Sequence, residues 1–294
     1  MKNAGVSRKK IVPIKRNTIL SIMLFAILAV WTVWGNKALM VNVIVVSSNR
    51  IPAAFSGFRI AQVSDLHNAE FGDGNEELLE LLSESKPDII VITGDLIDSS
   101  HTDAGIALGF AQESVRIAPT YFVTGNHEAA SSQYDTLKAG LEDAGVIVLE
   151  DEAVFLERNG ENIALLGLDD PDFTVKGDMF GEVPAMVGTK LRNLDNGEGG
   201  YTILLSHRPE LFETYVNCGI NLVFAGHAHG GQFRLPFIGG VIAPPNQGLF
   251  PKYDAGLYTD GGTNMVVSRG IGNSIIPLRF NNRPEIVLVE LNAR

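Results

Sequence analysis

The 294-residue sequence contains a single cysteine, Cys218. One thiol can form no internal disulfide, and it cannot supply the several thiolates of a cysteine-rich zinc site. Stability must therefore come from a hydrophobic core, and Cys218 is predicted to be a small buried residue. Internal repeats and low-complexity runs are also missing, and hydrophobic residues make up 45% of the chain, enough for one large domain or two small ones.

Basic residues are scarce beyond residue 34. The first 34 residues hold six Lys/Arg and no Asp/Glu, whereas residues 35–294 carry 17 Lys/Arg against 34 Asp/Glu, a net charge of −17. Broad nucleic-acid binding requires Lys/Arg side chains that neutralise phosphates, so no specific nucleic-acid partner is expected. The same acidic balance is compatible with the binding of cations.

Charged residues are absent from Thr18 to Trp34, which follows a basic tail at residues 1–17. As a helix these 17 residues span about 26 Å at ~1.5 Å per residue, near the lower limit for crossing a bilayer. Trp31 and Trp34 end the stretch, where amphipathic rings favour the headgroup layer. We therefore expect a transmembrane signal anchor at residues 18–35, with the basic tail in the cytoplasm and the rest of this single-pass protein outside the cell membrane.

A cleaved signal peptide is the alternative for this stretch. Small residues in an A-x-A arrangement should then follow the apolar run, and the sequence Gly35-Asn36-Lys37-Ala38 matches that pattern poorly. A retained anchor is therefore favoured, and a buried helix of a soluble protein is the remaining alternative. In the favoured case, residues 38–294 form the domain that the anchor holds at the membrane.

Five apolar, β-rich runs are each followed directly by Gly, Asp or His, with Asn or His one or two positions further on in several of them. The clearest is 89–93, followed by Gly94-Asp95, which predicts a strand buried on both faces. Amphipathic helical patterns alternate with such strands, which favours a single α/β domain. Ligands bind at the carboxyl ends of strands in such sheets, so we interpret the five ends as one shared site. The runs are 60–64 before Asp65 and His67, 89–93 before Asp95, 121–124 before Asn126 and His127, 202–206 before His207, and 222–225 before His227 and His229.

Other elements are expected from periodicity and turn residues. Helices are predicted at 75–85, 104–116 and 133–144, and one helix with a preceding loop at 178–194. Strands are predicted at 38–46, 146–149, 153–156, 163–168 and 286–291, with a hairpin turn at Asn159-Gly160. The Gly- and Pro-rich region 232–262 is expected to form long surface loops near the site.

Asp65 and His67 are two residues apart, so on an extended segment both side chains point the same way. They could hold one metal ion, with His229 completing its ligands. Asp95 could touch this ion and a second one, because a carboxylate can bridge two cations.

The second ion could be held by His207, His227 and the side-chain oxygen of Asn126. Mixed imidazole and carboxylate ligands suit Mn, Fe, Zn or Ni, and they argue against Ca and against a thiolate-selecting metal. The sequence therefore predicts a centre for two divalent metal ions. Five of the six histidines belong to the motifs at the strand ends, and only His101 lies outside them.

This arrangement resembles the calcineurin-like metallophosphoesterase family. The resemblance spans about residues 58–232, and the motifs that carry it stand in the family's order: Asp65-x-His67, Gly94-Asp95, Gly125-Asn126-His127-Glu128, His207 and Gly226-His227-x-His229. It implies a four-layer α/β/β/α sandwich of two mixed β-sheets in residues 38–294, metal-ligand roles for the seven residues named above, and a catalytic role for His127. The continuation through Gln232 and the tail motifs at 268–270, 279–280 and 284–286 are similar to the bacterial membrane-associated phosphodiesterase branch.

The expected function is metal-dependent phosphoester hydrolysis, by a phosphodiesterase or pyrophosphatase that acts on lipid- or envelope-related substrates. A water held between the two cations would be the nucleophile. A protein phosphatase or a nuclease is the alternative enzyme, and the acidic body disfavours the nuclease. A non-catalytic scaffold on the same fold predicts degenerate ligand positions, whereas every ligand position is filled here.

Several other polar residues have two interpretations. Asp98 either orients a ligand or caps a helix N-terminus. For Asp169 and Asp170, a turn before Pro171 is favoured over a substrate contact. Three arginines could hold a phosphate or form structural salt bridges: Arg208, Arg269 and Arg279.

Overall fold

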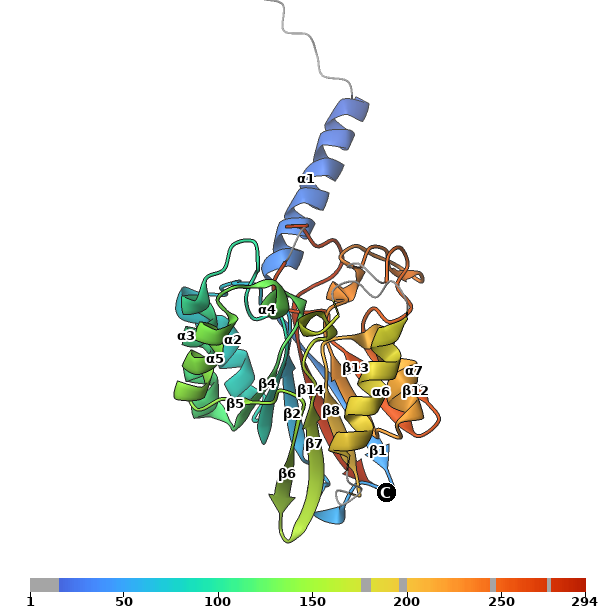
Figure 1. Ribbon diagram of the computed structural model, residues 1–294. Helices are drawn as coiled ribbons and strands as arrows, with labels where there is room; N and C mark the ends of the chain where they lie inside the picture. Colours follow the sequence, from blue (N-terminus) through green and yellow to red (C-terminus); the bar gives the residue numbers. More distant parts are fainter. Residues whose placement is uncertain (1–15, 176–180, 196–199, 244–246, 274–275) are drawn as a thin grey trace, which may run out of the picture.

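Two six-stranded mixed β-sheets pack face to face, and helices cover their outer faces (Figure 1). The computed structural model describes residues 16–175, 181–195, 200–243, 247–273 and 276–294. The arrangement is the four-layer α/β/β/α sandwich that the resemblance implied, so the prediction of the fold is confirmed. Helix α1 (Arg16–Lys37) extends away from one end of the sandwich (Figure 1).

The first sheet has the strand order β1-β14-β2-β3-β4-β5. Strands β2 to β5 are parallel, whereas β14 is antiparallel to β2 and parallel to β1. Strand β1 therefore begins at the edge of the sheet where β2, β3 and β4 end. The bounds are β1 Met40–Ser48, β2 Arg59–Val63, β3 Ile89–Thr93, β4 Thr120–Val123, β5 Ile147–Val148 and β14 Glu285–Ala293.

The second sheet has the order β12-β13-β9-β8-β7-β6. Its four central strands are parallel, and β6 and β12 pair antiparallel at the two edges. The predicted turn at Asn159-Gly160 joins β6 to β7. The bounds are β6 Glu152–Arg158, β7 Glu161–Gly167, β8 Thr202–Leu205, β9 Leu222–Ala225, β12 Gly256–Asp260 and β13 Thr263–Val267.

The alternation of side chains along the strands divides the core into three clusters. In β3, Val91 faces the second sheet, whereas Ile90 and Ile92 face the helices on the outer surface of the first sheet. In β9, Phe224 lies between the sheets and Val223 faces the outer helices of the second sheet. The covering helices are α2 Glu76–Glu84, α3 Ala104–Ile117 and α5 Tyr134–Asp143 on the first sheet, and α6 Glu182–Leu194 and α7 Phe212–Asn217 on the second.

Short segments complete the fold. Helix α4 (Asn126–Ala130) follows β4 directly, and strands β10 (Arg234–Leu235) and β11 (Gly239–Gly240) form a small hairpin. Single turns of 3-10 helix are η1 Ala53–Phe55, η2 Asp73–Asn75, η3 Pro171–Phe173, η4 Pro209–Leu211 and η5 His229–Gly231.

Some expectations need correction. The region 232–262 is not loop throughout, because it contains the β10–β11 hairpin and the edge strand β12, and the sequence analysis missed β13 altogether. Strand β12 is largely exposed, so it lacks the apolar pattern that marks buried strands. Cys218 is only half-buried. Helix α6 begins at Glu182, and residues 178–180 of the predicted helix and loop lie outside the described residues.

Replacing Phe224 with Ala should remove a fully buried ring from between the two sheets and lower the free energy of unfolding by about 3–5 kcal/mol. Phe155→Ala is the matched control, because that ring is 41% exposed and its loss should cost well under half as much. Denaturant unfolding of both variants in detergent measures the difference. Equal losses would contradict the assignment of Phe224 to the core between the sheets.

Candidate metal centre

The ends of strands from both sheets meet at one place. Asp65 donates its backbone N–H to Gly94 O at 3.0 Å, which joins the end of β2 to the end of β3. The Nδ1 atom of His207, after β8, lies 2.8 Å from Thr93 O, which joins the second sheet to the first. The backbone N–H of His227, after β9, donates to Asp65 Oδ1 at 3.1 Å. The strand ends thus meet at one place, as expected, although they come from two sheets.

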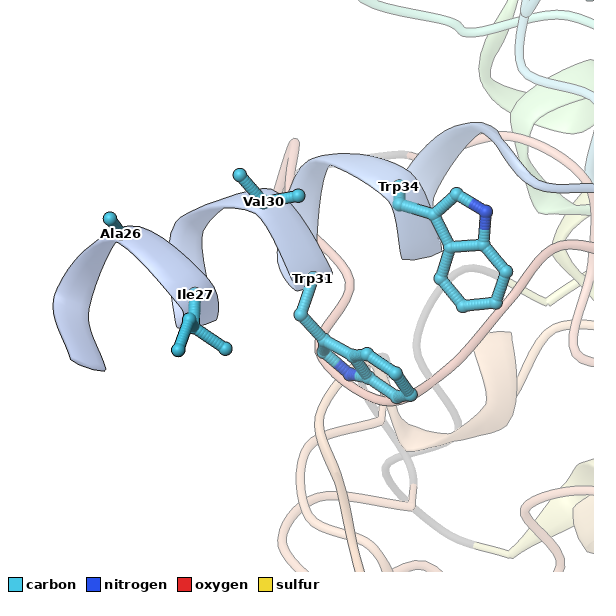
Figure 2. Close-up of a pocket in the computed structure, with 5 residues that line it drawn as sticks. All are labelled: Ala26, Ile27, Val30, Trp31 and Trp34. Carbon is cyan, nitrogen blue, oxygen red and sulfur yellow. The ribbon is translucent and has the colours of Figure 1, made fainter. Parts of the chain in front are cut away.

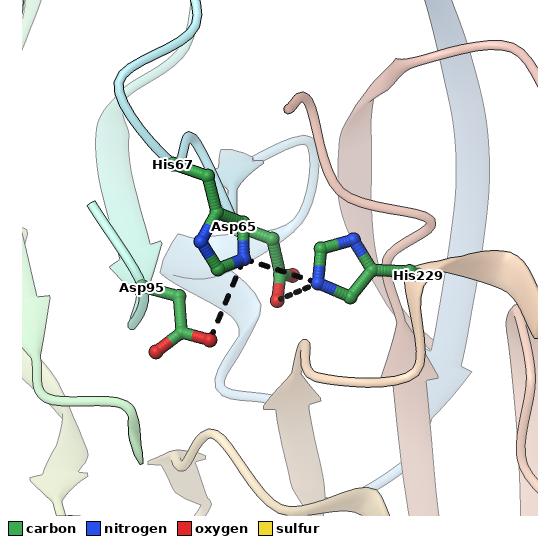
Figure 3. A group of neighbouring side chains, drawn as sticks. All are labelled: Asp65, His67, Asp95 and His229. Carbon is green, nitrogen blue, oxygen red and sulfur yellow. Dashed lines mark hydrogen bonds and ion pairs between the residues drawn. The ribbon is translucent and has the colours of Figure 1, made fainter. Parts of the chain in front are cut away.

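Four side chains converge in the first group: Asp65, His67, Asp95 and His229 (Figure 3). The Nε2 atoms of His67 and His229 lie 3.1 Å apart. His67 Nε2 lies 3.6 Å from Asp95 Oδ2, and His229 Nε2 lies 3.4 Å from Asp65 Oδ1. All four residues are buried, so the two imidazoles and two carboxylates face one another with little access to solvent.

The second group consists of Asp95, His207 and His227. His207 Nε2 lies 3.1 Å from Asp95 Oδ2, the same oxygen that faces His67. All three residues are buried. Asp95 therefore belongs to both groups, and it is the residue that the sequence analysis placed between two ions.

The donor atoms fit a divalent cation. Thr93 O can only accept a hydrogen bond, so His207 Nδ1 carries a proton and Nε2 is the atom that faces the Asp95 carboxylate. That contact is favourable only when a cation, a proton or a metal ion, lies between the two atoms. Four buried atoms around the groups also have no hydrogen-bond partner among the described residues: His67 Nδ1, His207 Nε2, His229 Nδ1 and Asn126 Oδ1.

Charge and burial shift several pKa values here. Burial alone would lower the pKa of His207, but the charge of Asp95 outweighs it and raises this pKa to about 10. Burial would likewise raise the pKa of Asp95, and the facing His207 instead holds it well below its usual value. Burial raises the pKa of Asp65 to about 6 and lowers that of His67 to about 4. The imidazole of His67 is therefore neutral at pH 7, as metal ligation requires.

The backbone of these residues is strained. The backbone φ angles of five residues lie between +47° and +65°, the left-handed region that residues other than glycine rarely adopt: Asp65, His67, Asp95, His227 and His229. Such strain concentrates where the surrounding structure imposes a functional geometry. The premise that Asp65 and His67 converge on an extended segment is thus wrong, because a left-handed turn brings them together.

Two glycines allow the strand ends to approach so closely. A Cβ atom at Gly125 would lie only 2.3 Å from Asp95 Oδ1, and one at Gly226 would collide with the Ser64 hydroxyl and Asp65. Any side chain at either position would force the groups apart. The glycines of the Gly-Asn-His-Glu and Gly-His-x-His motifs are therefore required by packing around the carboxylates.

His127 lies beside the first group rather than in it. Its Nδ1 accepts the backbone N–H of Ser99 at 2.9 Å, so the proton of the neutral ring is on Nε2. Its ring meets that of His67 edge-on, with centroids 4.5 Å apart. The ring is partly exposed, which suits a group that exchanges a proton with a substrate.

Glu128, which the sequence analysis quoted only as part of a motif, supports the loops of the site. Its buried carboxylate accepts the backbone N–H groups of Asp95 and Gly125 at 2.8 Å and of Ile97 at 3.2 Å. It thereby ties the end of β3 to the start of α4, where Asn126 lies. Burial, with the charge of Asp95 added, raises the pKa of Glu128 to about 7.

Two of the residues with two interpretations, Arg208 and Asp170, contact each other. Arg208 forms a buried bidentate salt bridge with Asp170, through Nε at 2.6 Å and Nη2 at 2.7 Å, and its Nη1 lies 3.4 Å from His227 Nε2. Asp170 also accepts the N–H of Asp172, so it forms the expected turn as well. These contacts place Arg208 in a structural ion pair that borders the second group.

Asp98 is not a helix N-cap, because the residue that caps α3 is Asp103. Its Oδ1 accepts the N–H of Ser100, and its Oδ2 faces His67 and His127, at 3.8 Å and 4.0 Å from their Nδ1 atoms. The orienting interpretation is therefore the one that the geometry favours.

The missed strand β13 supplies one further wall of the site. The loop after it bonds to the first motif, through Ile271 N to Ser64 O at 3.0 Å and Gly272 N to Asp65 O at 2.7 Å. The buried Arg279 secures this loop by donating to Arg269 O at 2.7 Å and to Gly272 O at 2.5 Å. The run of hydrophobic residues at 265–267 is the signal that could have revealed β13.

Comparison with known proteins agrees with this geometry. Residues 58–231 match the family model described as calcineurin-like phosphoesterase. The chain is 33% identical over 259 residues to the uncharacterized metallophosphoesterase YkuE of Bacillus subtilis, covering 84% of each protein. It is 28% identical over 240 residues to the phosphodiesterase YaeI of Escherichia coli, covering 80% of this chain and 82% of that one. It is also 30% identical over 292 residues to a transmembrane protein with metallophosphoesterase domain of Danio rerio, covering 94% of this chain and 63% of the other.

Replacing Glu128 with Gln should weaken the binding of divalent metal, although the side chain keeps its size. An amide has one acceptor oxygen, so one side of Gln would direct an N–H group at backbone N–H donors. Loss of such support around metal ligands typically costs about 10–100-fold in metal affinity. Calorimetric titration of metal-free protein with Mn²⁺ measures the change, and Glu142→Gln on the exposed face of α5 is the control. Unchanged affinity in Glu128→Gln would mean that the carboxylate only stabilises the loop.

Proposed function

Because this chain belongs to the calcineurin-like phosphoesterase family, a family of hydrolases of phosphoester bonds that use divalent metal ions, we propose that it is a phosphodiesterase with two metal ions. Its natural substrates are proposed to be phosphodiesters or pyrophosphates of membrane lipids or of the cell envelope. The name of the E. coli relative, a phosphodiesterase, supports the diester preference.

One observation carries this proposal: Asp95 Oδ2 faces His67 in one buried group and His207 in the other. The proposed ligands of the first ion are Asp65, His67, His229 and Asp95, and those of the second are Asp95, His207, His227 and Asn126. A scaffold without catalysis has no use for two strained, buried groups of metal-ligand atoms that share one carboxylate. Mn, Fe, Zn and Ni remain the metals that suit such a donor set.

When bound, such a pair of divalent ions lowers the pKa of a coordinated water and offsets charge that develops on the phosphoryl oxygens. The protein's own contribution is to hold the ligand atoms in place and to supply one proton. His127 Nε2 carries that proton, because Ser99 N–H occupies Nδ1. The proposed role of His127 is to donate this proton to the leaving oxygen of the ester.

The membrane is the proposed location. Helix α1 has 22 residues, and an 18-residue window within it has a mean hydropathy of 2.1 and is nearly all exposed, so the helix is compatible with a single membrane span. The basic residues at 1–17 favour the cytoplasm for the N-terminus, so the proposed location of residues 38–294 is outside the cell. The Danio rerio relative is likewise named a transmembrane protein.

The proposed function predicts hydrolysis of bis(p-nitrophenyl) phosphate by the metal-loaded protein in detergent. Turnover should require added Mn²⁺, cease with a chelator, and exceed that of the monoester p-nitrophenyl phosphate. Absorbance of released nitrophenol measures both rates. A protein that holds metal and hydrolyses neither ester would favour the scaffold alternative, and a preference for the monoester would contradict a phosphodiesterase.

Asp95→Asn should lower the number of bound metal ions from two per chain, because an amide has a single oxygen and no charge to share between the groups. Elemental analysis of the purified variant, beside the unchanged protein, counts the ions. Asp143→Asn is the control, since this exposed carboxylate at the end of α5 belongs to no candidate metal group among the described residues and should leave the count unaltered. Two ions retained in Asp95→Asn would refute the bridging role.

His127→Ala should keep both metal ions and slow phosphodiester turnover by about 10²–10⁴-fold, the usual range for loss of a general acid. His101→Ala is the matched control, because this exposed histidine contributes no side-chain ligand atom to either group. Metal content and turnover are measured on the same samples. An equal rate in the two variants would remove His127 from the mechanism.

A further inference from the structure

The membrane helix joins the domain at the same end as the metal centre. Strand β1 follows α1 and runs opposite to β2, because β14 is parallel to β1 and antiparallel to β2. The start of β1 therefore lies at the end of the sheet where β2 finishes and Asp65 follows. Figure 1 shows this arrangement, with α1 leaving the sandwich on the side of α4, which begins at Asn126.

Hydrogen bonds fasten the last turn of α1 to the loops of the site. The Asn36 side chain donates to Arg279 O and accepts from Arg279 N, each at 2.8 Å. Arg283 donates to Ala38 O at 2.8 Å, and its guanidinium lies 4.9 Å from the ring centroid of Trp34. Arg279 is also the residue whose side chain secures the loop against Asp65, so the helix and the metal centre are linked through one residue.

The β10–β11 hairpin projects from this end. Its base is bonded to the residue after Arg279, through Arg234 N to Phe280 O at 2.9 Å. Arg234 also donates to Gly230 O, next to His229, and forms a salt bridge with Asp254, which accepts from Gly240 N across the hairpin. The hairpin is thus held firmly at both strands, close to the first metal group.

The tip of this hairpin is apolar and faces solvent. Phe237 is fully exposed and Ile238 is 62% exposed. Beyond α1, the described residues include twelve exposed large hydrophobic side chains, and half of them lie on the hairpin or on segments bonded to it: Leu235, Phe237, Ile238, Leu249, Phe250 and Leu278. Such a concentration marks an interaction surface rather than the scattered apolar residues of an ordinary surface.

The tryptophans of α1 indicate the level at which the bilayer begins. Trp31 and Trp34 line an apolar groove near the end of the helix, with ring centroids 5.4 Å apart (Figure 2). Tryptophan rings favour the headgroup layer, and Trp34 precedes the end of α1 by three residues, about 4.5 Å at ~1.5 Å per residue. The end of the domain that carries the hairpin therefore lies within about one helical turn of that layer.

We propose that the tip of the β10–β11 hairpin, with Phe237 and Ile238 at its apex, inserts into the interfacial layer of the bilayer that α1 enters. The domain then has two attachments to one membrane, the helix and the hairpin, and both are at the end that holds the metal centre. This contact fixes the tilt of the domain and holds the metal groups near the headgroup phosphates. The consequence for substrate choice, a phosphoester carried by a lipid, rests on the proposed function, whereas the contact itself does not.

The test uses the full chain with Cys218→Ala, which frees the protein of its native thiol, and a new cysteine that carries an environment-sensitive NBD dye. Phe237→Cys places the dye at the hairpin tip. Asn159→Cys is the control, because the β6–β7 turn lies at the end of the second sheet where β7 and β8 begin, opposite to the end where β8 and β9 finish. Each protein is reconstituted singly into phosphatidylcholine–phosphatidylglycerol nanodiscs, with or without lipids that carry a doxyl quencher near the headgroup end.

The expected result is a blue-shifted emission at position 237 and a loss of intensity to the quencher lipids, since interfacial segments bury their apolar face ~5–10 Å into the headgroup/acyl boundary. The dye at position 159 should show neither effect. A dye at 237 that is unquenched overturns the proposal, and a blue shift without quenching would mean that the dye packs against the protein itself rather than the lipid. Equal quenching at both positions also overturns it, because the domain would then lie on its side.

Turnover of bis(p-nitrophenyl) phosphate by the same labelled proteins with Mn²⁺ reports on the proposed function independently. Quenching without turnover would retain the membrane contact and reject the phosphodiesterase. Turnover without quenching would reject the membrane contact and retain the phosphodiesterase.

Discussion

The Asp95 carboxylate is the interaction on which the rest of the site depends. Its Oδ1 accepts the N–H of His127, which orients the group, and its Oδ2 faces the imidazoles of His67 and His207. Electron-rich atoms brought this close in a buried place repel one another unless a cation lies between them. The geometry of the other ligand atoms, the tautomer of His207 and the contacts of Glu128 all follow from keeping this one carboxylate in position.

Holding it there has a structural cost. Five residues of the two groups adopt left-handed backbone, and neighbouring glycines have no room for a Cβ atom. The strands that precede these residues, β2, β3 and β9, are buried except at Arg59, so the core can impose the strained conformation. The rigid sandwich thus supplies the free energy that a flexible loop could not provide, and it places ligand atoms before any metal ion binds.

The same end of the sandwich carries helix α1. Arg279 contacts both the last turn of α1, through Asn36, and the loop that packs on Asp65. The order of strands β1, β14 and β2 therefore brings the end of α1 and the candidate metal groups to the same end of the sandwich. Under the proposed function, this is the end that faces the membrane.

The amino-acid sequence by itself determined the buried strands, the polar residues after them and the apolar stretch of α1, because periodicity, turn residues and local charge are properties of neighbouring residues. His207 and His227 could be proposed as ligands from their positions after apolar runs. Tertiary structure alone decided that the strand ends belong to two sheets, that left-handed turns rather than an extended segment unite Asp65 and His67, and that β13 and Arg279 close the site. Those features depend on contacts between residues far apart in the chain, which only the packing of the two sheets brings together.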